Sequence, residues 1–246
     1  MPKITTHNSW VPVRSEPKSA SENVTSLLFG ETAEVLEDKG DWFKIQMDYD
    51  GYTGWVGKEY VHESNGILDL HICTSKYARY QGKFGSIKIP VGAELQGDSI
   101  MVNGESLVFT DEGDSVVQVN PKSIGPHAIY QFLHAPYLWG GRSVHGIDCS
   151  GLVQVCMKMA GNKFPRDASQ QLKEGELIQF GMHQVNDLAY FHKEGKITHI
   201  GILLNNNQII HASGKVRIDV LKPEGIYNSE IQKITHSLHS IKRVDI

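Results

Sequence analysis

Residues 146–153 read Gly-Ile-Asp-Cys-Ser-Gly-Leu-Val, and this stretch predicts the beginning of a helix with a cysteine in its first turn. Asp148 is a natural N-cap, apolar residues follow at helical spacing, and Gly161 is a natural C-terminal stop. Because the first amides of a helix are unpaired and its dipole favours negative charge, we expect the pKa of the Cys149 thiol to lie below its free value of about 8.5. Cys156, on the apolar face, is expected to be a small buried side chain, which is also the alternative for Cys149.

Two of the twelve histidines lie on runs that predict a β-hairpin. Residues 197–204 and 208–212 have the apolar character of strands, and three asparagines between them indicate a turn. A hairpin centred on Asn205 places His199 directly opposite His211, where Cβ atoms are about 5 Å apart. The two imidazoles are then close enough to hydrogen-bond.

A thiol nucleophile needs a base, and the base needs a partner that orients it. We therefore expect His199 to accept the proton of Cys149, and His211 to hold the tautomer and tilt of the His199 ring. The alternative is that both histidines are structural. Surface or structural positions are expected for His7, His71, His127, His134, His183, His192, His236 and His239.

The first 120 residues differ in character from the rest of the chain. They contain short runs of β type separated by turn residues, and in 42–48 the apolar Phe43, Ile45 and Met47 alternate with polar neighbours. Strands this short and evenly spaced favour small barrels. We expect two small all-β domains over 1–63 and 64–120. Helical patterns followed by strands then predict an α+β domain over 121–246.

Composition excludes several classes of protein. The 246 residues are 21% charged and 40% hydrophobic, as in ordinary globular proteins, and the net charge of −4 argues against a nucleic-acid partner. No apolar run reaches the roughly 18 residues of a membrane span. The first residues lack a secretory signal, so we expect a cytoplasmic protein, or a periplasmic or secreted one whose signal was removed before Met1. Three scattered cysteines without a CxxC motif give no disulfide framework and no metal site, and no cofactor is expected.

Five blocks of the C-terminal region resemble the NlpC/P60 family of papain-like cysteine peptidases, in order and in spacing. The N-terminal residues 5–62 resemble the bacterial SH3 (SH3b) pattern, and 64–120 is interpreted from its position as a degenerate SH3b-like barrel. One departure is Val185-Asn186-Asp187-Leu188, where the family often has Pro-Gly-Asp-Leu. The five blocks are Tyr137–Gly141, Gly146–Val153, Phe164–Arg166, Thr198–Ile202 and Ile210–Ser213.

The resemblance implies a catalytic set that agrees with the reasoning from the residues. Cys149 is implied as the nucleophile, His199 as the base and His211 as the third polar member. The hydroxyl of Tyr137 is implied near the oxyanion site, with backbone N–H groups at Cys149 or Ser150 as further donors. The alternative for Tyr137 is an aromatic side chain that packs on the helix before it.

The domain order is similar to that of γ-D-glutamyl-L-diamino acid endopeptidases of murein-peptide recycling. The resemblance implies hydrolysis of stem peptides with a free N-terminal L-Ala, releasing L-Ala-γ-D-Glu. It suggests that Asp148, Glu31 and Tyr52 recognise the free ammonium, since leaving a buried carboxylate unpaired is costly. The respective alternatives are a helix cap, a solvated charge at a strand edge, and ordinary packing in a barrel.

Three other functions stay open at this point. The first is an exported wall hydrolase that acts on polymeric murein, with the SH3b units as anchors. The second is a binding module with an inactive catalytic domain, and the third is an acyltransferase that uses the same thiol. The residue types do not distinguish meso-diaminopimelate from L-Lys. We expect a monomer whose partners are murein stem peptides.

Overall fold

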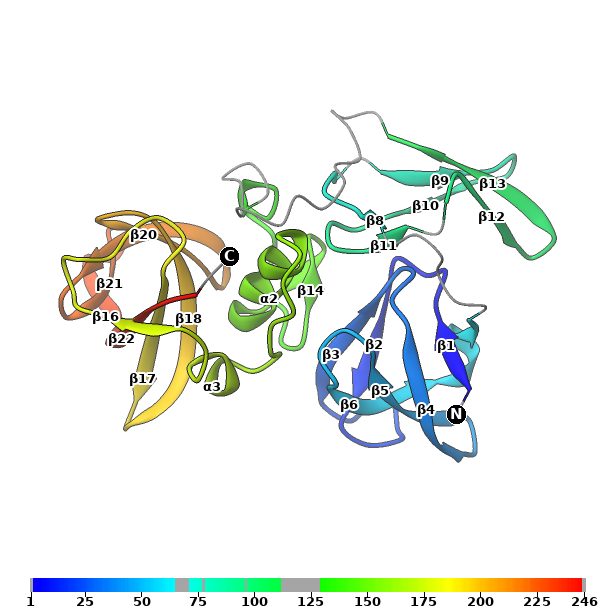
Figure 1. Cartoon of the computed structure of the whole chain (residues 1–246), viewed down its shortest axis with the longest axis horizontal. Coiled ribbons are helices and arrows are strands. Elements are labelled where there is room, and N and C mark those ends of the chain that lie inside the picture. Colours follow the sequence, from blue (N-terminus) through cyan, green and yellow to red (C-terminus); the bar gives the residue numbers. More distant parts are fainter. Residues whose placement is uncertain (1, 65–70, 77, 96, 112–128, 245–246) are drawn as a thin grey trace. The chain divides into compact units, whose positions relative to one another are not determined.

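The computed structural model describes every residue except 1, 65–70, 77, 96, 112–128 and 245–246 (Figure 1). The chain divides into two compact units. The first comprises 1–121 together with 139–144, and the second comprises 122–138 together with 145–246. In the part of the chain that the structure describes, none of the helices has the length and apolar character that crossing a membrane requires.

A seven-stranded antiparallel sheet forms the N-terminal part of the first unit, in the order β3-β2-β6-β5-β4-β1-β7. The alternation expected in 42–48 is confirmed, because Ile45 and Met47 are buried and Gln46 is exposed. Val11, Val13 and Leu27 from other strands complete this apolar core. The elements are β1 (Lys3–Thr5), β2 (Trp10–Arg14), β3 (Asn23–Leu28), β4 (Ala33–Lys39), β5 (Trp42–Met47), β6 (Thr53–Gly57), η1 (Lys58–Tyr60) and β7 (His62–Glu63).

A second set of strands follows within the first unit. It forms a four-stranded sheet in the order β10-β9-β13-β12 and a two-stranded sheet of β11 and β8. Its core includes Phe29 of the preceding part, whose ring lies 5.4 Å from that of Tyr80. Gly30 allows this approach, because a Cβ there would lie 1.8 Å from the Glu94 carbonyl oxygen. The strands are β8 (His71–Ile72), β9 (Arg79–Gln81), β10 (Ser86–Lys88), β11 (Glu94–Leu95), β12 (Ser99–Val102) and β13 (Glu105–Thr110).

The segment 139–144, which contains β14 (Arg142–Ser143), completes the first unit. The Arg142 guanidinium is fully buried and donates to both Glu31 oxygens over 2.9 Å, and Glu31 also accepts from the backbone N–H of Leu28 over 2.8 Å. The alternative for Glu31, a solvated charge at a strand edge, is therefore wrong. Burial alone would disfavour either charge, and the pairing compensates for the lost hydration.

The second unit contains a helix packed on an antiparallel sheet, as the α+β pattern predicts. The sheet order is β16-β22-β17-β18-β19-β20-β21, and an additional pairing of β22 with β21 closes it. The predicted helix is confirmed as α2 (Cys149–Met159). One of the helical patterns of the sequence, over 126–134, lies partly outside the described residues. The other elements are β15 (Gly146–Ile147), α3 (Ala168–Gln171), β16 (Glu176–Ile178), β17 (Leu188–Lys193), β18 (Lys196–Asn205), β19 (Gln208–Ser213), β20 (Lys215–Lys222), β21 (Gly225–Asn228) and β22 (Lys233–Arg243).

Two strands of this sheet, β21 and β22, were not predicted, and β22 is the one that matters for the site. β22 spans eleven residues, but most of its side chains are exposed or half-buried, so its sequence lacks the apolar alternation of a typical strand. It is nevertheless central in the sheet, because it pairs with β16, β17 and β21. Its position matters for the site, since β22 carries His236.

Replacing Arg142 by Ala is expected to destabilise the first unit by about 3–5 kcal/mol, because the Glu31 carboxylate would stay buried without its partner. Urea denaturation of the full chain, monitored by fluorescence, measures this change. Lys58→Ala is the matched control, since Lys58 pairs with Asp38 at the surface and its loss should cost at most about 1 kcal/mol. Equal shifts of the midpoint for the two variants would contradict the prediction.

Candidate active site

Cys149 is the first residue of α2, and its side chain is buried. The Asp148 side chain caps the helix by accepting from the backbone N–H of Gly151 over 2.7 Å. The backbone N–H groups of Ile200 and Ser150 hydrogen-bond to the Cys149 sulfur. The sulfur therefore lies between the first turn of α2 and Ile200 of β18, and Ile200 is the residue that follows His199.

The pKa of the Cys149 thiol does not fall as expected. Burial raises it, and the Asp148 carboxylate raises it further, while the N–H groups of Ile200 and Ser150 and the Arg166 guanidinium act in the opposite direction. The expectation of a lowered pKa is therefore wrong for the resting site, because desolvation outweighs the helix terminus. The resting residue is a neutral thiol.

Cys156 behaves as predicted for a core residue. Its side chain is completely buried on α2, and burial raises the pKa of its thiol. Cys73 is also buried, in the core of the first unit. Of the three cysteines, Cys149 is the one that receives a hydrogen bond from the hairpin, from the backbone N–H of Ile200.

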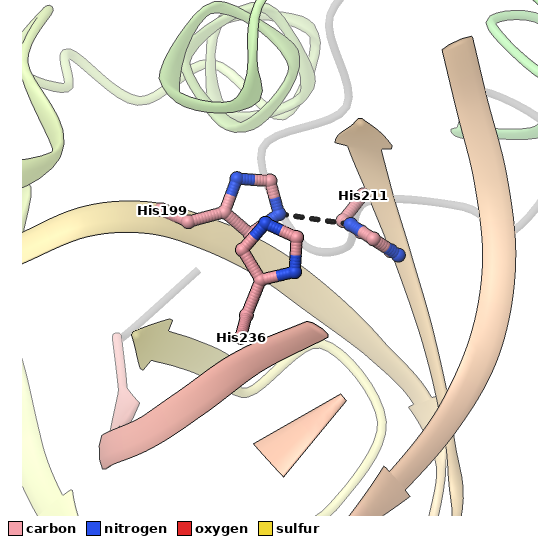
Figure 2. Close-up of side chains that lie close together, drawn as sticks. All are labelled: His199, His211 and His236. Atoms are coloured by element: carbon pink, nitrogen blue, oxygen red, sulfur yellow. Dashed lines mark hydrogen bonds between the residues drawn. The ribbon is translucent and has the colours of Figure 1, made fainter. Parts of the chain in front are cut away.

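His199 on β18 and His211 on β19 are hydrogen-bonded, with 2.8 Å between Nε2 of His199 and Nδ1 of His211 (Figure 2). The predicted register is wrong by two residues, because Gly201 and not His199 is opposite His211. An irregularity between Leu203 and Asn205 shifts the pairing. Side chains alternate between faces with a period of two, so this shift keeps both histidines on one face. The rings meet edge to face, at 85°.

Asp219 on β20 extends this pair to three groups. Its Oδ2 lies 3.0 Å from Nε2 of His211, and both side chains are buried. Arg217 holds the same carboxylate with two hydrogen bonds of 2.8 and 3.0 Å. Burial acts to raise the pKa of Asp219, but the hydrogen bonds from His211 and Arg217 lower it. Sequence reasoning missed Asp219, although its spacing of two residues from Arg217 places the two side chains on one face of a strand.

These contacts determine the tautomer that each ring has in its neutral form. An ionised carboxylate only accepts hydrogen bonds, so Nε2 of His211 carries the proton that Asp219 receives. Nδ1 of His211 is then an acceptor, and Nε2 of His199 donates to it. The lone pair of the His199 ring is consequently on Nδ1. Burial, followed by the neighbouring His211 and His236, lowers the pKa of His199 well below its usual value, so this ring is neutral at pH 7.

His236 is the clearest correction to the expected surface or structural histidines. Its ring stacks on that of His199, with centroids 4.1 Å apart and an angle of 24° between the planes (Figure 2). Burial, followed by His211, lowers the pKa of His236 to about 4. The contact could not be expected from the sequence, because β22 itself was not predicted. His127 lies outside the described residues.

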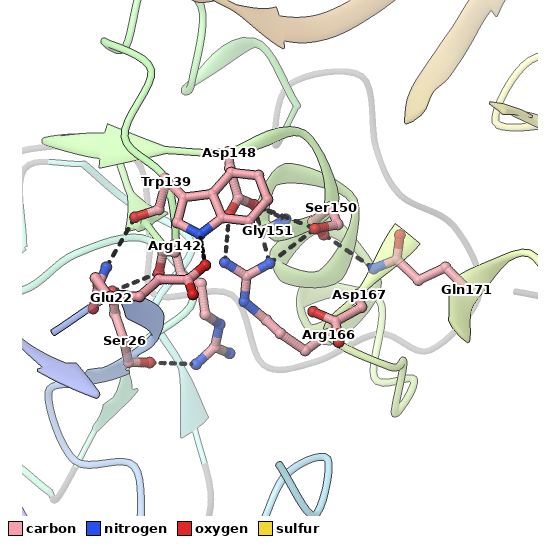
Figure 3. Close-up of polar contacts among 12 residues, drawn as sticks. Glu22, Ser26, Trp139, Arg142, Asp148, Ser150, Gly151, Arg166, Asp167 and Gln171 are labelled. Atoms are coloured by element: carbon pink, nitrogen blue, oxygen red, sulfur yellow. Dashed lines mark hydrogen bonds and ion pairs between the residues drawn. The ribbon is translucent and has the colours of Figure 1, made fainter. Parts of the chain in front are cut away.

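Asp148 is part of a buried ion pair with Arg166 (Figure 3). The guanidinium donates to both carboxylate oxygens, over 3.0 and 2.6 Å, and to the Ser150 hydroxyl over 2.9 Å. Gln171 donates to the Ser150 carbonyl over 3.1 Å. The cap interpretation of Asp148 is confirmed, and Arg166, which the sequence showed only as part of a motif, is the residue that balances its charge.

Tyr137 lies in the second unit, where its backbone N–H donates to the Gly214 carbonyl over 3.0 Å. Burial raises the pKa of the Tyr137 hydroxyl to about 12, and its electrostatic interactions with Cys149 and with the Asp148 carboxylate add to the rise. The hydroxyl is thus near the thiol. Tyr52 lies in the first unit, half-buried against the core of the seven-stranded sheet.

Comparison with known proteins gives consistent relationships. The NlpC/P60 family model matches residues 134–235, and the bacterial SH3 domain model matches 10–62. The γ-D-glutamyl-L-lysine dipeptidyl-peptidase of Bacillus subtilis (strain 168) is 31% identical over 84% of this chain and 78% of its own length. The γ-D-glutamyl-L-lysine dipeptidyl-peptidase of Bacillus cereus (strain ATCC 10987 / NRS 248) is 25% identical over 79% of this chain and 68% of its own length. The crystal structure of an NlpC/P60 family protein from Bacillus cereus ATCC 10987 has the same fold, with a TM-score of 0.81 and 18% identity. The match covers 99% of this chain and 100% of that protein.

Proposed function

The chain belongs to the NlpC/P60 family of cysteine peptidases and carries an N-terminal bacterial SH3 domain, and we propose that Cys149 is the nucleophile with which it hydrolyses the bond between γ-D-glutamate and a diamino acid in peptidoglycan stem peptides. The observation that carries this role is the position of the buried thiol, at the start of α2 and hydrogen-bonded by the N–H group of Ile200. His199, the residue before Ile200, is the base.

The reaction begins from two neutral groups. Nδ1 of His199 takes the proton from Cys149 as the sulfur attacks the γ-carbonyl carbon of the D-glutamyl residue. The carbonyl oxygen becomes an oxyanion, which the backbone N–H groups of Cys149 or Ser150 and the Tyr137 hydroxyl stabilise. The intermediate then expels the amine of the diamino acid, which receives the proton from His199. Water, deprotonated by the same ring, hydrolyses the resulting thioester.

His211 and Asp219 orient the base during these steps. The imidazolium that forms at His199 donates a hydrogen bond from Nε2 to His211, and His211 donates one from its own Nε2 to Asp219. Arg217 holds Asp219 in place and lowers its pKa, so Asp219 stays ionised. His211 therefore has the third position of a triad, and Asp219 acts through it.

We also propose that Asp148, Glu31 and Tyr52 recognise the free N-terminal ammonium of the substrate. The two carboxylates are already paired with Arg166 and Arg142. Asp148 already accepts hydrogen bonds from Arg166, the Ser150 hydroxyl and the Gly151 N–H, so its part in the proposal is to attract the ammonium by charge. The Ser150 hydroxyl donates to Asp148 and accepts from Arg166, while its backbone N–H hydrogen-bonds to the Cys149 sulfur in the resting site.

The remaining expectations are proposals of the same kind. We infer that 64–120 is a second, degenerate SH3b-like domain, supported by its separate antiparallel sheet and its buried residues. We propose that the protein acts as a cytoplasmic monomer on soluble stem peptides. The domain limits 1–63, 64–120 and 121–246 remain a prediction, and the segment 139–144 belongs to the first of the two compact units.

Cys149→Ala is expected to abolish turnover of L-Ala-γ-D-Glu-L-Lys, because no other described thiol is beside His199. Release of L-Ala-γ-D-Glu, followed by chromatography, measures the rate. Cys156→Ala is the matched control and should retain turnover, since Cys156 is a core residue on the same helix. Residual activity of Cys149→Ala equal to that of the control would refute the assignment.

Asp219→Asn is expected to lower kcat at least tenfold with little change in KM, because the amide no longer selects the His211 tautomer. Steady-state kinetics with the tripeptide measure both constants. Glu230→Gln is the control, since exposed Glu230 binds the same Arg217 over 3.1 Å without contacting His211. A loss of the same size in both variants would show that Arg217, and not the tautomer, matters.

N-acetylation of the tripeptide is expected to lower kcat/KM by at least about a hundredfold, because an amide carries no charge for the carboxylates. Glu31→Gln should raise KM for the free-amine peptide, whereas exposed Glu37→Gln should not. Equal rates on both peptides, or efficient release from intact murein, would instead support a wall hydrolase. Unchanged KM in Glu31→Gln would remove Glu31 from the substrate site.

A further inference from the structure

Three histidines meet in the second unit, although the proposed reaction uses only two of them. One ring nitrogen from each of His199, His211 and His236 lies within 4.8 Å of the others. They come from β18, β19 and β22, and Figure 2 shows the three rings close together, with that of His236 stacked on that of His199. His236 has no role in the proton transfers described above.

Two of these nitrogens, those of His199 and His211, have a separation close to that in a zinc site. Zn–N bonds of about 2.0–2.1 Å in tetrahedral geometry place ligand nitrogens about 3.3 Å apart. Nε2 of His199 and Nδ1 of His211 are 2.8 Å apart, so they need to separate by only about 0.5 Å for such a geometry. His236 is stacked on His199 and half-buried, so its ring must turn about its own Cβ–Cγ bond to aim a lone pair at the ion.

The surroundings of the cluster have the arrangement that supports imidazole ligands. A metal-binding histidine commonly donates its other ring N–H to a carboxylate, which fixes its orientation. His211 does so with Asp219, whose carboxylate Arg217 holds in turn. Nδ1 of His236 lies 2.9 Å from the Thr235 hydroxyl, so Nε2 is the nitrogen available to an ion.

We propose that His199, His211 and His236 form an inhibitory site for Zn²⁺, with water as the fourth ligand. Neutral imidazoles suit zinc, whereas Mg²⁺ and Ca²⁺ prefer oxygen ligands. Coordination through Nε2 of His199 requires the proton of that nitrogen to move to Nδ1. The lone pair that accepts the Cys149 proton is then lost, and the peptidase is switched off while the ion is bound. This effect on catalysis rests on the function proposed above.

Calorimetry on the full chain tests the site without using catalysis. In a Cys149→Ala background, titration with ZnCl₂ is expected to show one ion per chain. Adding His236→Phe, which keeps an aromatic ring for stacking but removes the ligand nitrogen, should weaken binding at least tenfold. His239→Phe, three residues along the same strand, should leave it unchanged. Absence of the one-to-one event, or equal affinities in the two double variants, would overturn the proposal.

Inhibition of the wild-type enzyme gives the second readout. Zn²⁺ is expected to inhibit hydrolysis of the tripeptide, Mg²⁺ at the same concentration is not, and a chelator should restore the rate. The inhibition constant should rise at least tenfold in His236→Phe, with each rate compared to that of the same variant without metal. Unchanged inhibition in His236→Phe would assign the ion to Cys149 and His199 alone and refute the three-histidine site. If the protein fails to hydrolyse the peptide, the calorimetry still decides the binding site.

Discussion

The buried hydrogen bond between His199 and His211 is the interaction on which the candidate site depends. It connects the base to the carboxylate of Asp219, and through the donor and acceptor types it determines which nitrogen of His199 is left for Cys149. The bond requires both histidines on one face of the sheet. Strand pairing supplies this condition, and a two-residue change of register leaves it intact.

Burial governs the electrostatics around this bond. It raises the pKa of the Cys149 thiol and lowers that of His199, so the resting pair is neutral and carries no separated charge. Elsewhere, two buried carboxylates are each paired with an arginine. Asp148 is held by Arg166 in the second unit, and Glu31 by Arg142 in the first. Each pair supplies the partner without which burying a carboxylate would be costly.

Sequence patterns predicted elements well where one face is apolar and the other polar. The helix from Cys149, its Asp148 cap and the two strands of the histidine hairpin follow from local periodicity and capping. The same patterns did not predict β22, because its side chains are mostly exposed or half-buried. The contact of His236 with His199 was therefore not predicted either, since the two residues are far apart along the chain and the pairing partners of β22 are not encoded locally.

The sequence by itself determined the local chemistry: a capped helix that begins with a cysteine, two histidines of the same parity on a hairpin, and motifs specific enough to identify the family. Only the tertiary structure decided the pKa of the thiol, the carboxylate behind His211 and the partners of the buried acids. The physical reason is that burial and long-range pairing depend on what the rest of the chain places around a group. Asp219, Arg166 and His236 reach the site from segments whose packing cannot be derived from their own residues.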